Sequence, residues 1–272
     1  MTDHPHTVFV LGGGGNLGAV QVGMLQALVE AGITPDAIVG ASVGALNGAF
    51  FAGHCDLAGV EALRELWLTV KRQDLFPTSM RSISRGLFDP QNHLFSPAAL
   101  RSLILRTDIG FSRVEEAPID LHIVTTDLCR VEVVVLSTGD ATTSLLASAA
   151  IPGLFPPVEI GGRTLVDGGV LSNLPVAQAE ELDPSVIYVL PATVDRTFCD
   201  PSNAIVMLQR AMAMAGLPDQ RRALEAAASR RQVRVLPVPE EAATLSIFDF
   251  KETNRLIHDA NLLSARMLEK GT

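Results

Sequence analysis

One serine in this chain has the surroundings of a nucleophile. Ser42 lies in Gly40-Ala41-Ser42-Val43-Gly44, directly after the β-branched pair Ile38-Val39 and before a run of helix-forming residues. A strand that turns sharply into a helix leaves no room for Cβ atoms beside the turn, which accounts for a glycine two residues away on each side. The sequence therefore predicts a serine hydroxyl that projects out of the sheet at the tip of this turn, with the amide of Val43 close to it.

A glycine-rich loop over residues 12–18, Gly-Gly-Gly-Gly-Asn-Leu-Gly, is the second stretch that could do chemistry. It follows an apolar strand at 7–11 and precedes a helical stretch at 19–31. A loop of this kind presents unpaired backbone N–H groups at the positive end of a helix dipole and so attracts negative charge. Those amides could stabilise the oxyanion of a tetrahedral intermediate, or the loop could be a tight turn without a ligand.

The same loop also matches a nucleotide-binding pattern. Gly13, Gly15 and Gly18 satisfy the dinucleotide fingerprint G-x-G-x-x-G. The acidic residue expected about 20 residues later, at the end of a second strand, is missing. A nucleotide-binding module using Gly12–Gly18 therefore stays as a minor alternative.

A serine hydroxyl needs a base before it can attack an ester. Histidine usually has this role, but none of the six histidines in the sequence has a suitable setting: His4, His6, His54, His93, His122 and His258. Asp167 is the better partner, because it ends the apolar stretch Thr164-Leu165-Val166 and is followed by two glycines. We therefore predict a Ser42–Asp167 dyad.

Composition narrows the class of protein. The 272 residues are 47% hydrophobic and carry a net charge of −9, which opposes binding to nucleic acid. The first six residues contain no Lys or Arg, so no signal peptide is expected. The uncharged runs at 8–29 and 37–54 are interrupted by glycines and are interpreted as core elements rather than membrane spans. The three cysteines form no metal-binding pattern, and we expect no metal and no cofactor. We expect a cytoplasmic protein, with peripheral contact to the membrane as the alternative location.

The rest of the chain alternates strands and helices without repeats or linkers, so we expect one domain over 1–272. The segment 71–97 is irregular and is a candidate cap over the site. The region 192–272 is expected to be a helical extension, with a helix over 203–231 that breaks at Gly216-Leu217-Pro218 and a closing helix over 252–269.

Several motifs together resemble the patatin-like phospholipases, in particular their small bacterial members. The resemblance covers about residues 8–191 and rests mainly on three motifs in order: the glycine loop, the serine turn and Asp167-Gly168-Gly169. The stretches Ala147–Pro157 and Asn173–Val176 also look like that family. It implies a three-layer α/β/α sandwich around a mostly parallel sheet.

The resemblance also implies roles for individual residues. Ser42 would be the nucleophile, Asp167 the base, and the amides of Gly13, Gly14, Gly15 and Val43 the oxyanion hole, without a metal or a cofactor. Many members have Arg where this chain has Leu17. Backbone donors survive that change, whereas any role of the Arg in fixing the loop is lost.

The expected function is hydrolysis of an acyl ester in a phospholipid or lysophospholipid through an acyl-enzyme. A catalytically silent or acyl-transferring relative is the alternative, because acyl transfer uses the same intermediate. The sequence indicates neither the head group, the substrate-binding residues nor the oligomeric state.

Overall fold

A computed structural model describes residues 7–75, 93–193, 204–245 and 250–270. These residues build one eight-stranded sheet in the order β5-β6-β3-β2-β1-β7-β8, with β4 paired to β3. Five strands run parallel: β1 (Thr7–Leu11), β2 (Ala37–Ala41), β3 (Asp120–Asp127), β7 (Val186–Leu190) and β8 (Gln232–Val235). Three are antiparallel to their neighbours: β4 (Glu132–Leu136), β5 (Val158–Ile160) and β6 (Arg163–Asp167).

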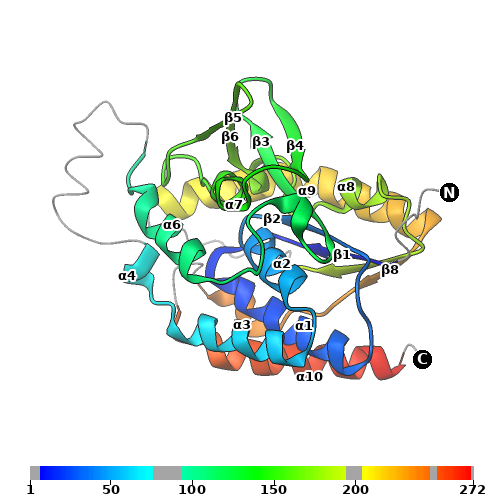
Figure 1. Ribbon diagram of the computed structural model, residues 1–272. Coiled ribbons are helices and arrows are strands. Elements are labelled where there is room, and N and C mark those ends of the chain that lie inside the picture. Colours follow the sequence, from blue (N-terminus) through cyan, green and yellow to red (C-terminus); the bar gives the residue numbers. More distant parts are fainter. Residues whose placement is uncertain (1–6, 76–92, 194–203, 246–249, 271–272) are drawn as a thin grey trace.

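Helices cover both faces of the sheet (Figure 1). One face carries α1 (Ala19–Glu30), α2 (Val43–Gly53), α3 (Leu57–Thr69), α6 (Pro97–Arg106), α7 (Ala141–Ser148) and α10 (Thr253–Lys270). The other face carries α8 (Val176–Glu180) and α9 (Ala204–Arg230). Short helical segments are α4 (Arg72–Leu75), η1 (Gly15–Gly18), η2 (Val114–Glu116), η3 (Gly168–Val170) and η4 (Glu240–Thr244). The predicted three-layer α/β/α sandwich with a mostly parallel sheet is therefore confirmed.

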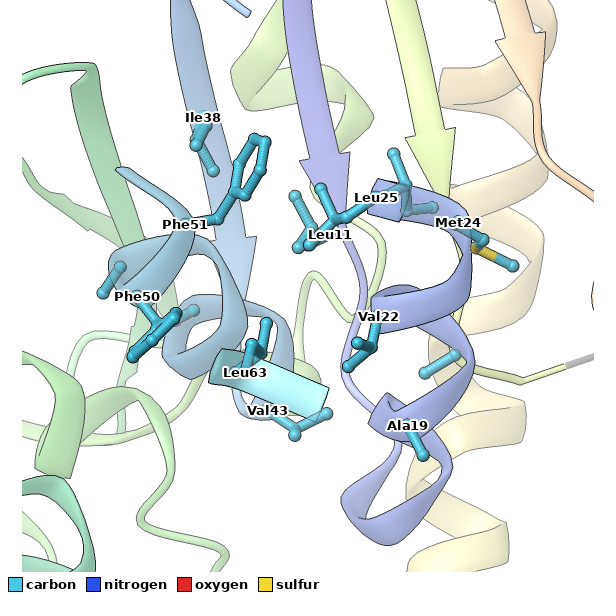
Figure 2. Close-up of a cluster of buried hydrophobic side chains, with 14 of the residues drawn as sticks. Leu11, Ala19, Val22, Met24, Leu25, Ile38, Val43, Phe50, Phe51 and Leu63 are labelled. Atoms are coloured by element: carbon cyan, nitrogen blue, oxygen red, sulfur yellow. The ribbon is translucent and has the colours of Figure 1, made fainter. Parts of the chain in front are cut away.

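Side chains along the central strands point alternately to the two faces of the sheet, and this explains why the protein has two hydrophobic cores. In β1, Phe9 and Leu11 face the layer of α1 and α2, whereas Val8 and Val10 face α8 and α9. Because successive side chains of a strand point to opposite faces, a strand buried on both sides must be apolar at every position. Figure 2 shows the larger core, where side chains of α1 and α2 meet those of β1 and β2.

One predicted helix boundary is wrong. The break expected at Gly216-Leu217-Pro218 does not occur, because α9 continues through Pro218 to Arg230. Proline costs a helix interior about 3 kcal/mol. Beyond it, Leu224 and Ala227 pack into the core beside β7 and β8, and this tertiary packing holds the last turns in place.

The expected cap lies largely outside the described residues, since it includes 76–92. Of its described parts, the amides of Leu94 and Phe95 donate to the carbonyls of Gly153 and Leu154. Among the described helices, none has both the length and the apolar sequence needed to cross a membrane.

Candidate active site

The turn at Ser42 has the strained geometry that its glycines predict. Ser42 is the residue between β2 and α2, with φ 55° and ψ −128°. A Cβ atom at Gly44 would lie 2.2 Å from the carbonyl oxygen of Leu11, and one at Gly40 would lie 2.7 Å from Cα of Ala45. Since Cβ atoms do not approach backbone so closely, glycine is required at both positions. A non-glycine residue at positive φ is uncommon, and such strain is typical of functional turns.

The hydroxyl of Ser42 and the carboxylate of Asp167 meet at this turn. Ser42 Oγ donates to Asp167 Oδ2 over 2.6 Å, although the residues are 125 positions apart. The pairing register of the strands explains why the side chains of these two residues lie together. Val124 of β3 pairs with Ala41 of β2, and the next residue, Thr125, pairs with Asp167 of β6. The residue after β2 and the last residue of β6 therefore come together at the same point along β3.

Burial changes the acidity of the Asp167 carboxyl. The residue is 5% exposed, and its second oxygen, Oδ1, accepts from the amide of Gly169 over 2.7 Å. Desolvation raises the pKa of Asp167 to about 6, against the opposing effect of the hydrogen bonds from Ser42 and Gly169. A carboxyl with this pKa is ionised at neutral pH and remains basic enough to accept a proton.

Ser148 of α7 holds the backbone of the nucleophile Ser42 in place through hydrogen bonds. Its side chain is fully buried; Oγ accepts from the backbone amide of Ser42 over 2.9 Å and donates to the carbonyl of Val124 over 2.7 Å. The strained turn is thus tied to β3 through one hydroxyl. Sequence reasoning did not assign this role to Ser148.

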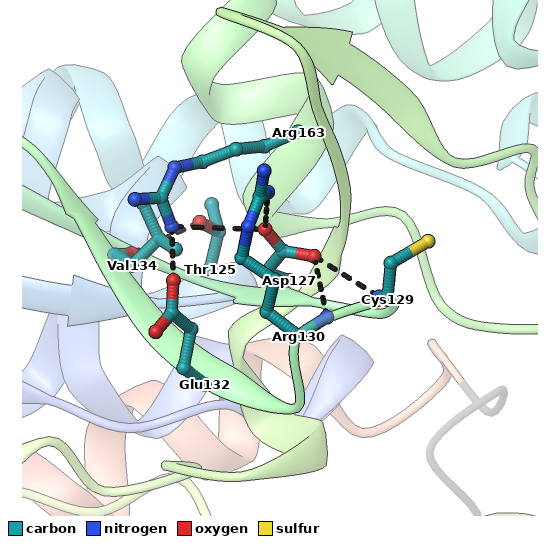
Figure 3. Close-up of polar contacts among 7 residues, drawn as sticks. All are labelled: Thr125, Asp127, Cys129, Arg130, Glu132, Val134 and Arg163. Atoms are coloured by element: carbon teal, nitrogen blue, oxygen red, sulfur yellow. Dashed lines mark hydrogen bonds and ion pairs between the residues drawn. The ribbon is translucent and has the colours of Figure 1, made fainter.

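A buried aspartate, Asp127, fixes the turn between β3 and β4 (Figure 3). Asp127 Oδ1 accepts from the amides of Cys129 and Arg130, both over 3.0 Å, and Oδ2 accepts from the Arg130 side chain over 2.7 Å. Arg163 of β6 lies 3.6 Å from the same carboxylate and also pairs with Glu132. These contacts fasten the end of β3 to β6, the two strands whose pairing sets the position of Asp167.

The glycine loop provides backbone donors, but one predicted donor has another partner. The amide of Gly13 donates to the carbonyl of Asn173 over 2.9 Å, and a Cβ atom at Gly13 would lie 3.0 Å from Cβ of Ser42. Gly13 therefore brings the loop close to the serine rather than offering a free N–H. The amides of Gly14, Gly15 and Val43 donate to no acceptor within the described part of the chain. Leu17, at the position where Arg was expected from the resemblance, is buried.

A cavity opens beside the serine, between α2, α3, α6 and α7. It encloses about 1000 Å³, including open solvent at its mouth, and is bordered by Gly15, Ser42 and Val43. The rest of its wall is mainly aliphatic and aromatic, and no charged side chain of the described residues borders it. Phe155, from the proline-rich stretch after α7, is one of the wall residues.

The histidines of the described chain do not contact the dyad. His54 lies stacked on Phe50, and His122 pairs with Asp120. No group of three His, Cys, Asp or Glu side chains that could hold a metal ion occurs in the described ranges.

The chain is similar to known proteins of one family. The family model for patatin-like phospholipases matches residues 9–180. Lysophospholipase nte1 of Neurospora crassa is 31% identical over 184 residues, which are 66% of this chain and 12% of that protein. An uncharacterized NTE family protein of Mycobacterium tuberculosis is 28% identical over 280 residues, covering 94% of this chain and 45% of the relative. The chain thus spans less than half the length of either relative.

A solved structure shares the fold. Human GIVD cytosolic phospholipase A2 superposes with a TM-score of 0.51 at 14% identity, over 98% of this chain and 58% of the human one. At this identity the likeness concerns the fold alone.

Proposed function

Because the chain belongs to the patatin-like phospholipase family, we propose that it hydrolyses acyl esters of lipids with Ser42 as nucleophile and Asp167 as base. The observation that carries the proposal is the 2.6 Å hydrogen bond from Ser42 Oγ to Asp167 Oδ2 at the wall of an apolar cavity. A buried carboxylate at this distance can accept the hydroxyl proton directly, so the reaction needs no histidine.

The first half of the reaction forms an acyl-enzyme. Ser42 Oγ attacks the ester carbonyl carbon while its proton passes to Asp167 Oδ2. The carbonyl oxygen becomes an oxyanion, which the amides of Gly14, Gly15 and Val43 stabilise; one such donor is worth about 3 kcal/mol in a comparable site. When the intermediate collapses, the C–O bond to the alcohol breaks and the proton on Asp167 goes to the departing alkoxide.

The second half releases the fatty acid. Water enters where the alcohol left and loses a proton to Asp167 as its oxygen bonds to the acyl carbon. Collapse of this second intermediate frees the carboxylic acid and returns the proton to Ser42 Oγ. Acyl transfer to an alcohol would follow the same steps, so product analysis with a competing alcohol distinguishes the two outcomes.

The cavity indicates the kind of substrate. Its wall suits a hydrocarbon chain, since burying each methylene gains about 0.8 kcal/mol. No charged side chain borders the cavity in the described ranges, so we expect the polar head group of the substrate to stay outside it. Together with the names of the relatives, this favours a phospholipid or a lysophospholipid as the substrate.

Hydrolysis of lysophosphatidylcholine by purified variants tests the proposal. We expect Ser42→Ala to release no fatty acid above background. Ser172→Ala is the matched control, because the Ser172 hydroxyl donates to Gln178 and does not touch the dyad. Full activity of Ser42→Ala would contradict the proposal, as would an inactive wild-type protein.

A further inference from the structure

Three buried polar side chains form a continuous hydrogen-bonded chain beneath the glycine loop. They come from three helices: Gln21 from α1, Asn47 from α2 and Trp67 from α3, and they are 0%, 2% and 8% exposed. The indole Nε1 of Trp67 donates to Asn47 Oδ1 over 2.9 Å, and Asn47 Nδ2 donates to Gln21 Oε1 over 2.8 Å. In the described part of the protein, none of the hydrogen bonds of these three side chains goes to Ser42 or Asp167.

The hydrogen bonds of Gln21, Asn47 and Trp67 reach backbone carbonyls at both ends of the glycine loop. Gln21 Nε2 donates to the carbonyl of Gly12 over 2.7 Å and to that of Leu190, the last residue of β7, over 3.0 Å. Asn47 Nδ2 donates to the carbonyl of Gly18 over 3.0 Å. Buried side chains therefore form hydrogen bonds to the carbonyls of the first and last residues of the loop.

The tryptophan at one end and the backbone carbonyls at the other fix the direction of every hydrogen bond among these three side chains. An indole N–H can only donate, so Asn47 must present its oxygen to Trp67 and its NH₂ to the other side. Gln21 must then present its oxygen to Asn47 and its NH₂ to the two carbonyls. The carbonyls of Gly12, Gly18 and Leu190 can only accept and favour the same orientation. Without the indole N–H, the buried Asn47 oxygen loses its donor.

We propose that Gln21, Asn47 and Trp67 are positioning residues that hold the glycine loop in place for the oxyanion and connect it to the cavity wall. The connection exists because Trp67 and Asn47 also border the cavity beside Ser42. An acyl chain in the cavity packs against the indole whose N–H orients the chain. This inference rests on the proposed function, since positioning has meaning only if the loop stabilises an oxyanion.

Trp67→Phe is the sharpest perturbation, because it removes the N–H and keeps an aromatic wall. Misplaced catalytic groups cost about 100-fold in rate for an error of about 1 Å, so we expect kcat on a soluble p-nitrophenyl ester to fall about 10- to 100-fold. KM should change less than about twofold, since oxyanion stabilisation acts on the transition state and not on the bound ester. Gln21→Met, which keeps the side-chain length and removes both donors, should have the same effect.

Two measurements distinguish an effect on the position of the glycine loop from a general loss of folded enzyme. Titration of reactive serine with a fluorophosphonate counts the folded enzyme, so kcat is expressed per labelled site. The affinity for a trifluoromethyl ketone, which forms an oxyanion on addition of the serine, should fall by the same factor as kcat. Leu103→Val is the control: it trims the cavity wall on α6 without touching the chain and should change KM more than kcat.

Unchanged kcat per labelled serine in both Trp67→Phe and Gln21→Met would overturn the inference. An equal loss of ketone affinity in Leu103→Val would also overturn it. Failure of the proposed function is distinguishable, because the wild-type protein would then neither hydrolyse the ester nor bind the ketone.

Discussion

Replacing Asp167 by Asn should stabilise the protein at alkaline pH while removing its activity. The folded pKa of Asp167 is raised to about 6 from 3.8 by burial. Between these two pH values the folded state binds more protons than the unfolded state, so stability falls as pH rises through this window. Well above pH 6 the full cost of the buried carboxylate applies, about 3 kcal/mol.

Asparagine carries no charge and therefore avoids this cost. Linkage makes the cost about 3 kcal/mol at pH 8 and about half of that at pH 5. We expect the free energy of unfolding of Asp167→Asn to exceed that of the wild type at pH 8, and the difference to shrink by about half at pH 5. Urea denaturation at the two pH values measures both quantities.

The exposed Asp219, with a side chain 73% accessible, supplies the control. Asp219→Asn should leave the free energy of unfolding almost the same as the wild type at both pH values, since exposed carboxylates contribute little. A difference between Asp167→Asn and the wild type that does not depend on pH would refute the reasoning. It would mean that the Asp167 carboxylate is not desolvated in the folded protein.

Two further predictions concern the rate. Because the base must be ionised, kcat/KM on a soluble ester should be flat above pH 7 and fall tenfold per pH unit below about 6; a profile flat down to pH 4.5 would contradict the role of Asp167. Ser148→Ala should lower both kcat and the unfolding free energy, the latter by about 1–3 kcal/mol, because it leaves the buried amide of Ser42 without an acceptor. Ser144→Ala on the same helix, whose hydroxyl donates only to the carbonyl of Asp140, should leave kcat unchanged; equal losses in the two variants would contradict the role of Ser148.

Local sequence patterns predicted the parts of the site that depend on local geometry. Glycine at 40 and 44 follows from the crowded turn around Ser42, and the structure shows backbone atoms where their Cβ atoms would lie. The position of Asp167 beside Ser42 depends instead on the pairing of β3 with both β2 and β6. The sequence indicated Asp167 through the lack of a suitable histidine, through its place at a strand end before two glycines, and through the order of motifs in a resembling family.

Other features depend on contacts between distant residues and had no local signal. The amide of Gly13 donates to the carbonyl of Asn173, a partner 160 residues away. The composition of the loop could not reveal this hydrogen bond. Gln21 and Asn47 did have a local signal, since Asn47 is a polar residue within the otherwise apolar α2 and Gln21 lies in the otherwise apolar first half of α1. A buried amide needs hydrogen-bond partners, so such residues point to a polar network even before its members are known.

The central claim is that Ser42 is an activated nucleophile. Incubation of the full chain with a fluorophosphonate, followed by peptide mass spectrometry, tests it most directly. We predict covalent label on the peptide that contains Ser42, at a rate that falls as Asp167 becomes protonated below about pH 6. A protein that hydrolyses lipid esters while its label lies on a different residue would contradict the account.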